Sequence, residues 1–282
     1  MNPILKDFIL DLTRLRRMLA LAETLSAFRC CALTAEVIEG NPDKDVIGKL
    51  QAAAKESHPD MPILNGVLTL YLAGRFENFV RELFEDLCDS VAGQCTYFSQ
   101  LPKAMRENLI KFTAEVVSSP RKYGHAENGV IAFVGTLAEN LNGYPLKGVN
   151  NKCLSITSEN MWADTLQEIF GRIGANKVWE RLGQQAPLQI FFHIDDPVKA
   201  TSESRKVLND FMVLRNKIAH PSGDLTWPSL DQALKYIDFC EKIATALSDI
   251  CAVWATTLGD KLPVTEKVTE GENASSPVVI SE

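Results

Sequence analysis

The segment LRNKIAHPSG, residues 214–223, places a cation, an amide and an imidazole within six residues. Histidine exchanges protons near neutral pH, so His220 could act as a base or an acid. Arg215 keeps its charge and can direct two N–H groups at phosphate oxygens. Together with Asn216, these residue types suit chemistry on a phosphate ester. They are also typical of an ordinary helix end, because a late histidine gains from the helix dipole and proline often follows. Composition alone favours this simpler interpretation.

The helix predicted over residues 202–219, which Thr201 or Ser202 could cap, has two adjacent rows of side chains. The rows are Val207, Phe211, Leu214 and Ile218, and Leu208, Met212, Arg215 and Ala219. Arg215 interrupts an apolar row, which is costly unless the cation is paired or opens to a cleft. Arg215 and His220 are five residues apart and share no helix face. They converge only if the helix loosens at His220, or if a second copy of the chain supplies one of them.

A second polar pair lies in the long helix predicted over residues 64–92. Glu77 and Arg81 are one helical turn apart, and their simplest interpretation is a solvated ion pair. The other hypothesis is that they line or brace the same cleft as His220. Gly74 lies in this helix and predicts a close approach by a neighbouring helix.

Composition bounds the class of protein. The chain has 282 residues, of which 46 % are hydrophobic and 23 % charged, as in an ordinary protein with a buried core. A net charge of −7 is not typical of a general nucleic-acid binder, so any contact with phosphate must be local. Seven scattered cysteines without a CxxC pair indicate a reducing compartment. Neither a signal peptide nor a membrane span is recognisable, so we expect a cytoplasmic protein.

Helical periodicity dominates the rest of the chain. Residues 5–22, 44–56, 64–92 and 229–257 carry apolar stripes at three- and four-residue spacing. The middle is divided by proline, glycine and asparagine into shorter amphipathic pieces. Its residues 188–193 predict a short strand or an extended strap. Residues 258–282 are rich in Glu, Ser, Thr and Val, which predicts a disordered acidic tail.

The pattern R-N-x-x-A-H at Arg215–His220, late in a helix that precedes one more long helix, resembles the HEPN superfamily and its RiboL-PSP-HEPN group. The helix with Glu77 and Arg81 adds to the resemblance. It implies an all-α fold, with a HEPN-like helical bundle core of residues 1–92 and 200–257. Residues 93–199 would be a mostly helical insertion between the second and third core helices. Pro221 and Ser222 depart from relatives that carry glycine and tyrosine at these places.

The resemblance implies a metal-independent endoribonuclease that needs no cofactor and cleaves RNA through its own 2′-hydroxyl. Arg215, His220 and Asn216 would be catalytic, at a composite site across a homodimer, with Glu77 and Arg81 in support. Such proteins serve as toxins or anti-phage effectors, so an antitoxin or defence-system partner is expected, and no membrane.

Other readings stay open at this point. One is a non-catalytic HEPN-like dimerisation, sensor or adaptor module, and another is an unrelated helical adaptor that uses the apolar row of residues 208–219. A metal site is a third, at His193–Asp196 or His58–Asp60. Neither of these two segments has a matching second cluster, so turn and cap roles explain them more simply.

Overall fold

The computed structural model describes residues 2–31, 42–123, 127–157, 160–222 and 225–258. In these ranges the chain forms α-helices, three short 3₁₀ turns and one isolated antiparallel bridge, between Tyr97 and Pro145. The predicted all-α class is confirmed for this part of the chain. The tail predicted at residues 258–282 lies outside the described residues, apart from Leu258. No described helix combines the length and apolar character that crossing a membrane requires.

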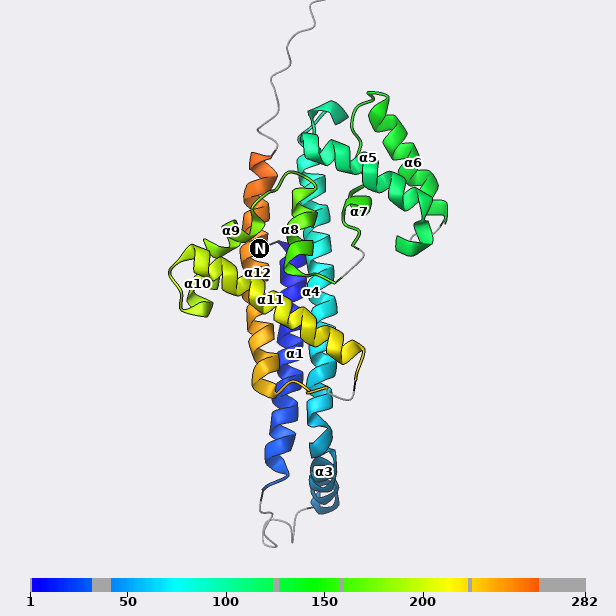
Figure 1. Ribbon diagram of the computed structural model, residues 1–282. Helices are drawn as coiled ribbons and strands as arrows, with labels where there is room; N and C mark the ends of the chain where they lie inside the picture. The colour runs from blue at the N-terminus through cyan, green and yellow to red at the C-terminus, as the bar shows by residue number, and fades with distance from the viewer. Residues whose placement is uncertain (1, 32–41, 124–126, 158–159, 223–224, 259–282) are drawn as a thin grey trace, which may run out of the picture.

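Three long helices form a bundle: α1 (Pro3–Phe28), α4 (Met61–Ala92) and α12 (Leu230–Thr257). They run side by side along the long axis of the molecule (Figure 1). Their predicted apolar stripes face one another, and buried Phe8 stacks on buried Phe79 with ring centroids 4.8 Å apart. Burying one such side chain contributes about 1.5–3 kcal/mol, so these stripes hold the bundle together.

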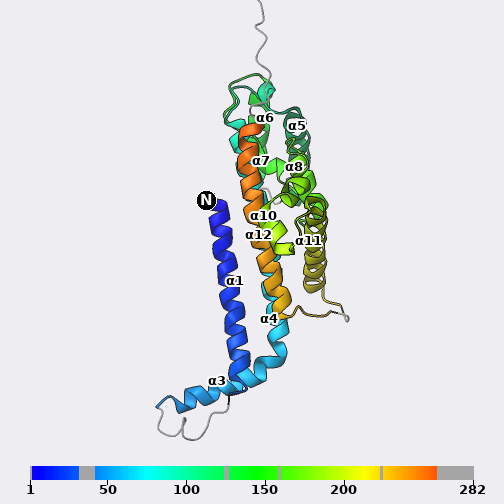
Figure 2. The same ribbon diagram turned by 90° about the vertical axis from the view of Figure 1, so that its left-hand side faces the viewer.

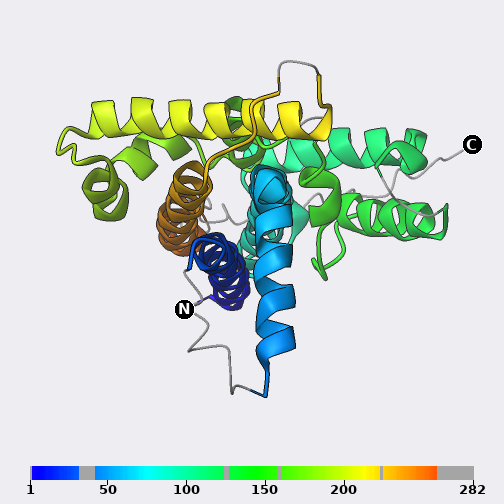
Figure 3. The same cartoon turned by 90° about the horizontal axis from the view of Figure 1, so that it is seen from below.

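The predicted break at residues 58–60 is a 3₁₀ turn, η1 (His58–Asp60), which separates α3 (Lys44–Ser57) from α4. Proline in its first turn fits this position, because an N–H group is not needed there. Figures 2 and 3 show α3 extending away from the three-helix bundle. Only Ala54 of α3 is buried, so this helix adds little to the core.

α11 (Pro197–Ala219) crosses the bundle obliquely, on the opposite side from α1 (Figures 1 and 2). It begins at Pro197 rather than near residue 202, and the predicted caps Thr201 and Ser202 are wrong. The cap is Asp196, whose Oδ1 accepts from the N–H of Val198 at 2.9 Å. Thr201 instead donates its hydroxyl to the carbonyl oxygen of Trp179, 3.1 Å away, which fastens the start of α11 to its neighbour.

Residues 93–199 are mostly helical, as predicted, and their helices fall into two groups. At one side of the bundle (Figure 1) lie α5 (Lys103–Ser118), α6 (Glu127–Leu141) and α7 (Asn151–Leu154). Near α11 and α12 lie α8 (Ala163–Gly171), α9 (Val178–Gly183) and α10 (Ala186–Phe192). The Phe170 ring of α8 lies 5.6 Å from the Trp254 ring of α12, so the second group shares the buried core of the bundle. The division of the chain into a core and an insertion remains a proposal.

Residues 188–193 are not extended, and the predicted strand or strap is wrong. They belong to α10, which has Pro187 in its first turn and ends at His193 with a left-handed φ of 55°. The rings of Phe191 and Phe192 pack against Phe239 of α12, with centroids 6.1 and 6.2 Å away. A short apolar run has no period that separates helix from strand, so this packing decides the conformation.

Buried Arg172 fixes the connection between α7 and α8, of which residues 155–157 and 160–162 are described. Its Nη1 donates to the carbonyl oxygens of Leu154 and Ile156 at 2.6 and 2.7 Å. Its guanidinium also lies 4.1 Å from the centroid of the Phe112 ring. The side chain is only 8 % exposed, so these contacts replace water for both the cation and the carbonyls.

Replacing Arg172 with methionine is expected to lower the free energy of unfolding by about 2–4 kcal/mol, since each buried carbonyl left unpaired costs about 1–3 kcal/mol. Urea denaturation followed by circular dichroism measures the change. Arg205→Met is the matched control, because Arg205 pairs with Asp164 at the surface and such pairs contribute less than about 1 kcal/mol. If the two variants lose the same free energy of unfolding, the buried contacts of Arg172 stabilise the protein no more than the surface ion pair of Arg205 does.

Candidate active site

An open cleft of about 810 Å³ lies between the middle of α4, the end of α11 and the α7–α8 connection. We call it the α4–α11 cleft, and it is lined by Glu77, Arg81, Thr157, Asn160, Trp162, Arg215, Asn216, Lys217 and His220. All five residues singled out from the sequence are in this set, although they come from two helices far apart in the chain. Their catalytic and supporting roles remain predictions.

The α4 wall of the cleft is held by Arg81. Its Nη2 donates to Oε1 of Glu77 at 2.6 Å and to Oγ1 of Thr157 at 2.9 Å. The side chains of Arg81 and Glu77 are 37 % and 21 % exposed. The ion pair expected from the sequence therefore forms, and it lies in a concave surface. Thr157 links it to the α7–α8 connection.

Asn216 organises the α11 wall. Its Oδ1 accepts from Nη1 of Arg215 at 3.1 Å and from Nδ2 of Asn160 at 2.6 Å. Among the described residues, the Asn216 amide makes no hydrogen bond to the His220 imidazole. The hydrogen bond between Asn216 and His220 is instead a backbone one, from the His220 N–H to the Asn216 carbonyl at 3.0 Å. Asn216 therefore positions Arg215 rather than the imidazole.

The end of α11 explains how Arg215 and His220 reach one cleft within a single chain. The last helical residue is Ala219, and His220 has φ −129° and ψ 70°, well outside the helical region. Pro221 disfavours a helical conformation in the residue that precedes it, which accounts for the change at His220. Of the two ways in which the pair could converge, the loosened helix end is the one present in this chain. The His220 side chain is exposed.

The charge in the cleft is opposite to that of the whole protein. Among the described residues that line the cleft, Arg81, Arg215 and Lys217 accompany one carboxylate, that of Glu77, whereas the chain carries a net charge of −7. A concave surface of one sign concentrates counter-ions, because its low-dielectric walls focus the field. The α4–α11 cleft is thus suited to an anion such as a phosphate group.

Besides Lys217, which lies inside the motif but was given no role, sequence reasoning missed three residues of the cleft, Thr157, Asn160 and Trp162. All three come from the α7–α8 connection, and two of them hydrogen-bond to residues that the sequence did single out. Nothing in their spacing predicts these contacts, since they join parts of the chain that are distant in sequence. The one local signal is an aromatic residue, Trp162, two positions after the polar run TSEN.

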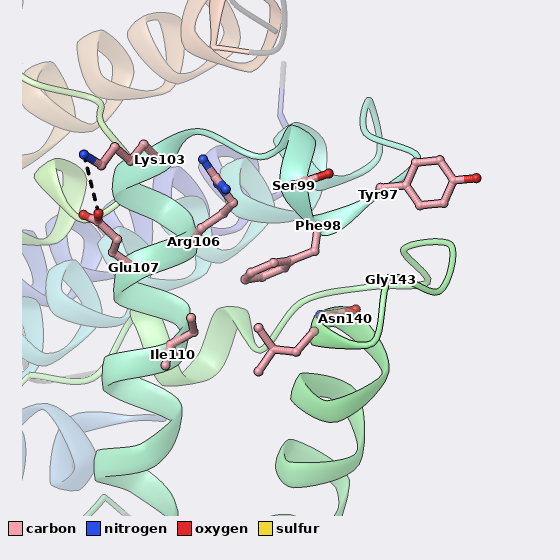
Figure 4. A pocket seen from close by; sticks show the side chains of 10 residues that line it. Tyr97, Phe98, Ser99, Lys103, Arg106, Glu107, Ile110, Asn140 and Gly143 are labelled. Atoms are coloured by element: carbon pink, nitrogen blue, oxygen red, sulfur yellow. Dashed lines mark ion pairs between the residues drawn. The ribbon is translucent and has the colours of Figure 1, made fainter. Parts of the chain in front are cut away.

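A second depression, of about 630 Å³, lies on α5 and α6 (Figure 4). Lys103 and Arg106 lie at its edge, and Lys103 is 3.8 Å from the carboxylate of Glu107. The described residues that line it include no histidine, whereas His220 lines the α4–α11 cleft.

In the described part of the chain, no group of three His, Cys, Asp or Glu side chains is placed to hold a metal ion. Asp196 caps α11 and His193 ends α10. These are the cap and turn roles that the sequence favours for this segment.

None of the described residues that line the α4–α11 cleft is a cysteine. Burial raises the pKa of the Cys88, Cys240 and Cys251 thiols above the ordinary cysteine value. These thiols stay protonated at neutral pH and act as apolar core groups.

Comparison with known proteins places the chain in a family. A family model described as RiboL-PSP-HEPN matches residues 43–253, which include α3, α4, α11 and nearly all of α12. No curated protein and no solved structure matches the chain. The match covers well over half of the sequence and both helical walls of the α4–α11 cleft. The chain belongs to the RiboL-PSP-HEPN family.

Proposed function

We propose that the protein is a metal-independent endoribonuclease that acts in the cytoplasm as a toxin or anti-phage effector. The observation that carries the proposal is the convergence of Arg215 and His220 on one cation-rich cleft. The membership of the HEPN-type family supports the same reaction class.

The proposed reaction needs a base, an acid and a cation. The 2′-oxygen of a ribose attacks the adjacent phosphorus while His220 removes its proton. The bond from phosphorus to the 5′-oxygen breaks, and an acid returns a proton to that leaving oxygen. Arg215 stabilises the charge that develops on the non-bridging phosphate oxygens. The products are a 2′,3′-cyclic phosphate and a 5′-hydroxyl.

The acid in this scheme is His220 of a second copy of the chain. Among the described residues of one chain, His220 is the histidine that lines the cleft, so the described part of a single protomer supplies one proton-transfer group of this kind. The exposed His220 side chain leaves room for a partner to approach. A homodimer with two clefts face to face would provide one histidine as base and one as acid.

The test is cleavage of a labelled RNA in the presence of EDTA, with the ends of the products mapped. We expect cleavage without added metal, products with a 2′,3′-cyclic phosphate, and no cutting at a linkage whose ribose lacks the 2′-hydroxyl. Loss of activity in EDTA that returns with a divalent cation would contradict the proposed chemistry.

A second candidate function is a non-catalytic HEPN dimerisation, sensor or adaptor module of a defence or toxin–antitoxin system. One observation favours it: no described residue hydrogen-bonds to the imidazole of His220, whereas catalytic bases are commonly oriented by a neighbour. Purified dimers that bind a partner protein yet leave every RNA intact would support this second function.

A further inference from the structure

Trp162 differs from the other tryptophans in its place on the molecule. Trp179 and Trp254 are buried in the core, at 0 % and 2 % exposure, and Trp227 packs over Gly66. Trp162 is half-buried and lines the α4–α11 cleft beside Arg215 and Arg81. It is the one aromatic residue of that lining, among side chains that are otherwise polar or charged.

The backbone around Trp162 is held against α11. The Trp162 N–H donates to the carbonyl oxygen of Asn160 at 2.8 Å, and the next N–H, of Ala163, donates to Oδ1 of Asn209 at 3.0 Å. Asn160 itself bonds to Asn216 through its amide. These contacts hold the backbone at Trp162 against α11, so this part of the chain needs little ordering when a ligand binds.

The indole N–H of Trp162 has no acceptor among the described residues, whereas that of Trp179 donates to the Ala163 carbonyl at 2.8 Å. A half-buried ring with an unused donor, next to cations that suit a phosphate, has the features of a nucleobase platform. Stacking on an aromatic ring accepts any base, because every base has a π-face.

We propose that Trp162 stacks on an unpaired nucleobase next to the scissile phosphate. This inference rests on the proposed function. The faces of a base inside a duplex are already covered by its stacked neighbours, so only a loop, bulge or single strand can offer a free base face to Trp162.

The experiment is fluorescence anisotropy with a labelled single strand whose 2′-hydroxyls are methylated, so that it binds but is not cut. We expect Trp162→Ala to raise the Kd about 5- to 100-fold. Trp162→Phe should keep most of the affinity, because it keeps an aromatic face. A duplex of the same sequence should bind more weakly and respond little to either variant.

Tyr144→Ala is the matched control, since Tyr144 is an aromatic residue with 59 % exposure that does not line the cleft. Thermal melts show whether each variant folds. If Trp162→Ala does not fold, the test uses Trp162→Phe instead, and its Kd is measured for a pyrimidine-only strand and for a purine-only strand. A wild-type protein that cuts RNA while Trp162→Ala binds single strands equally well would overturn this inference alone. A wild-type protein that neither binds nor cuts RNA would overturn the proposed function with it.

Discussion

Replacing His220 with alanine is expected to lower the rate of RNA cleavage by about 10²- to 10⁴-fold, the usual contribution of a positioned acid or base. The imidazole is exposed at a helix end and makes no described hydrogen bond, so its loss should leave stability nearly unchanged. Single-turnover cleavage of a labelled RNA, beside a thermal melt, separates the two effects. A variant that cuts at the parent rate would remove His220 from the mechanism.

His193→Asn is a suitable control for His220→Ala. His193 is an exposed histidine that ends α10 with a positive φ, a conformation that asparagine adopts more readily than alanine. It does not line the α4–α11 cleft, so we expect its replacement to keep the parent rate.

Mixing parent and His220→Ala chains tests the composite site. A dimer with one intact and one altered chain keeps a single cleft histidine, so we expect activity between those of the two pure dimers. The activity should also fall on dilution below the dimer dissociation constant. Activity that scales only with the amount of parent chain, at every dilution, would place all proton transfers in one protomer.

Replacing Gly183 with alanine is expected to destabilise the protein by about 3 kcal/mol, at the upper end for overpacking. A Cβ at residue 183 would lie 2.1 Å from Oγ1 of Thr201, 2.4 Å from the Pro197 carbonyl oxygen and 2.9 Å from the Thr201 nitrogen. Two of these atoms belong to the backbone of α11 and cannot rotate away. The helix that carries Arg215 and His220 would have to shift from α9, so activity should fall with stability.

The control for Gly183→Ala is Gly74→Ala. A Cβ at Gly74 would meet no atom within 4 Å, so the sequence prediction of a close helix approach there is wrong. In an exposed helix interior, alanine is more favourable than glycine by about 1 kcal/mol, and we expect a small gain in stability. Urea denaturation of both variants measures the contrast, and a loss at Gly74 equal to that at Gly183 would contradict the packing explanation.

The long helices could be predicted from the sequence because their apolar spacing is repeated over several turns, as along α4 and α12. The cleft could be predicted in part for a similar reason. Arg215 interrupts an apolar row, and a buried row tolerates a cation only when the cation meets a partner or a cleft. That argument needs one helix and no knowledge of its neighbours.

Other features depend on contacts between distant segments. The α10 helix is fixed by Phe239, which lies far along the chain from Phe191 and Phe192. The roles of Thr157 and Asn160 exist only when the α7–α8 connection meets α4 and α11. α11 begins at Pro197, before the predicted residue 202, because Asp196 followed by proline is a helix start that the spacing of the apolar residues does not reveal.

The residues that line the cleft are spread along the chain, and this determines when the cleft can form during synthesis of the protein. Glu77 and Arg81 leave the ribosome early, but Arg215 and His220 follow only after α10, and α12, which packs on α4, comes later still. A nascent chain that ends before residue 215 carries the α4 wall of the cleft without Arg215 and His220. Under the proposed function, a chain built in this order cannot cut RNA until the ribosome has read past the codon for His220.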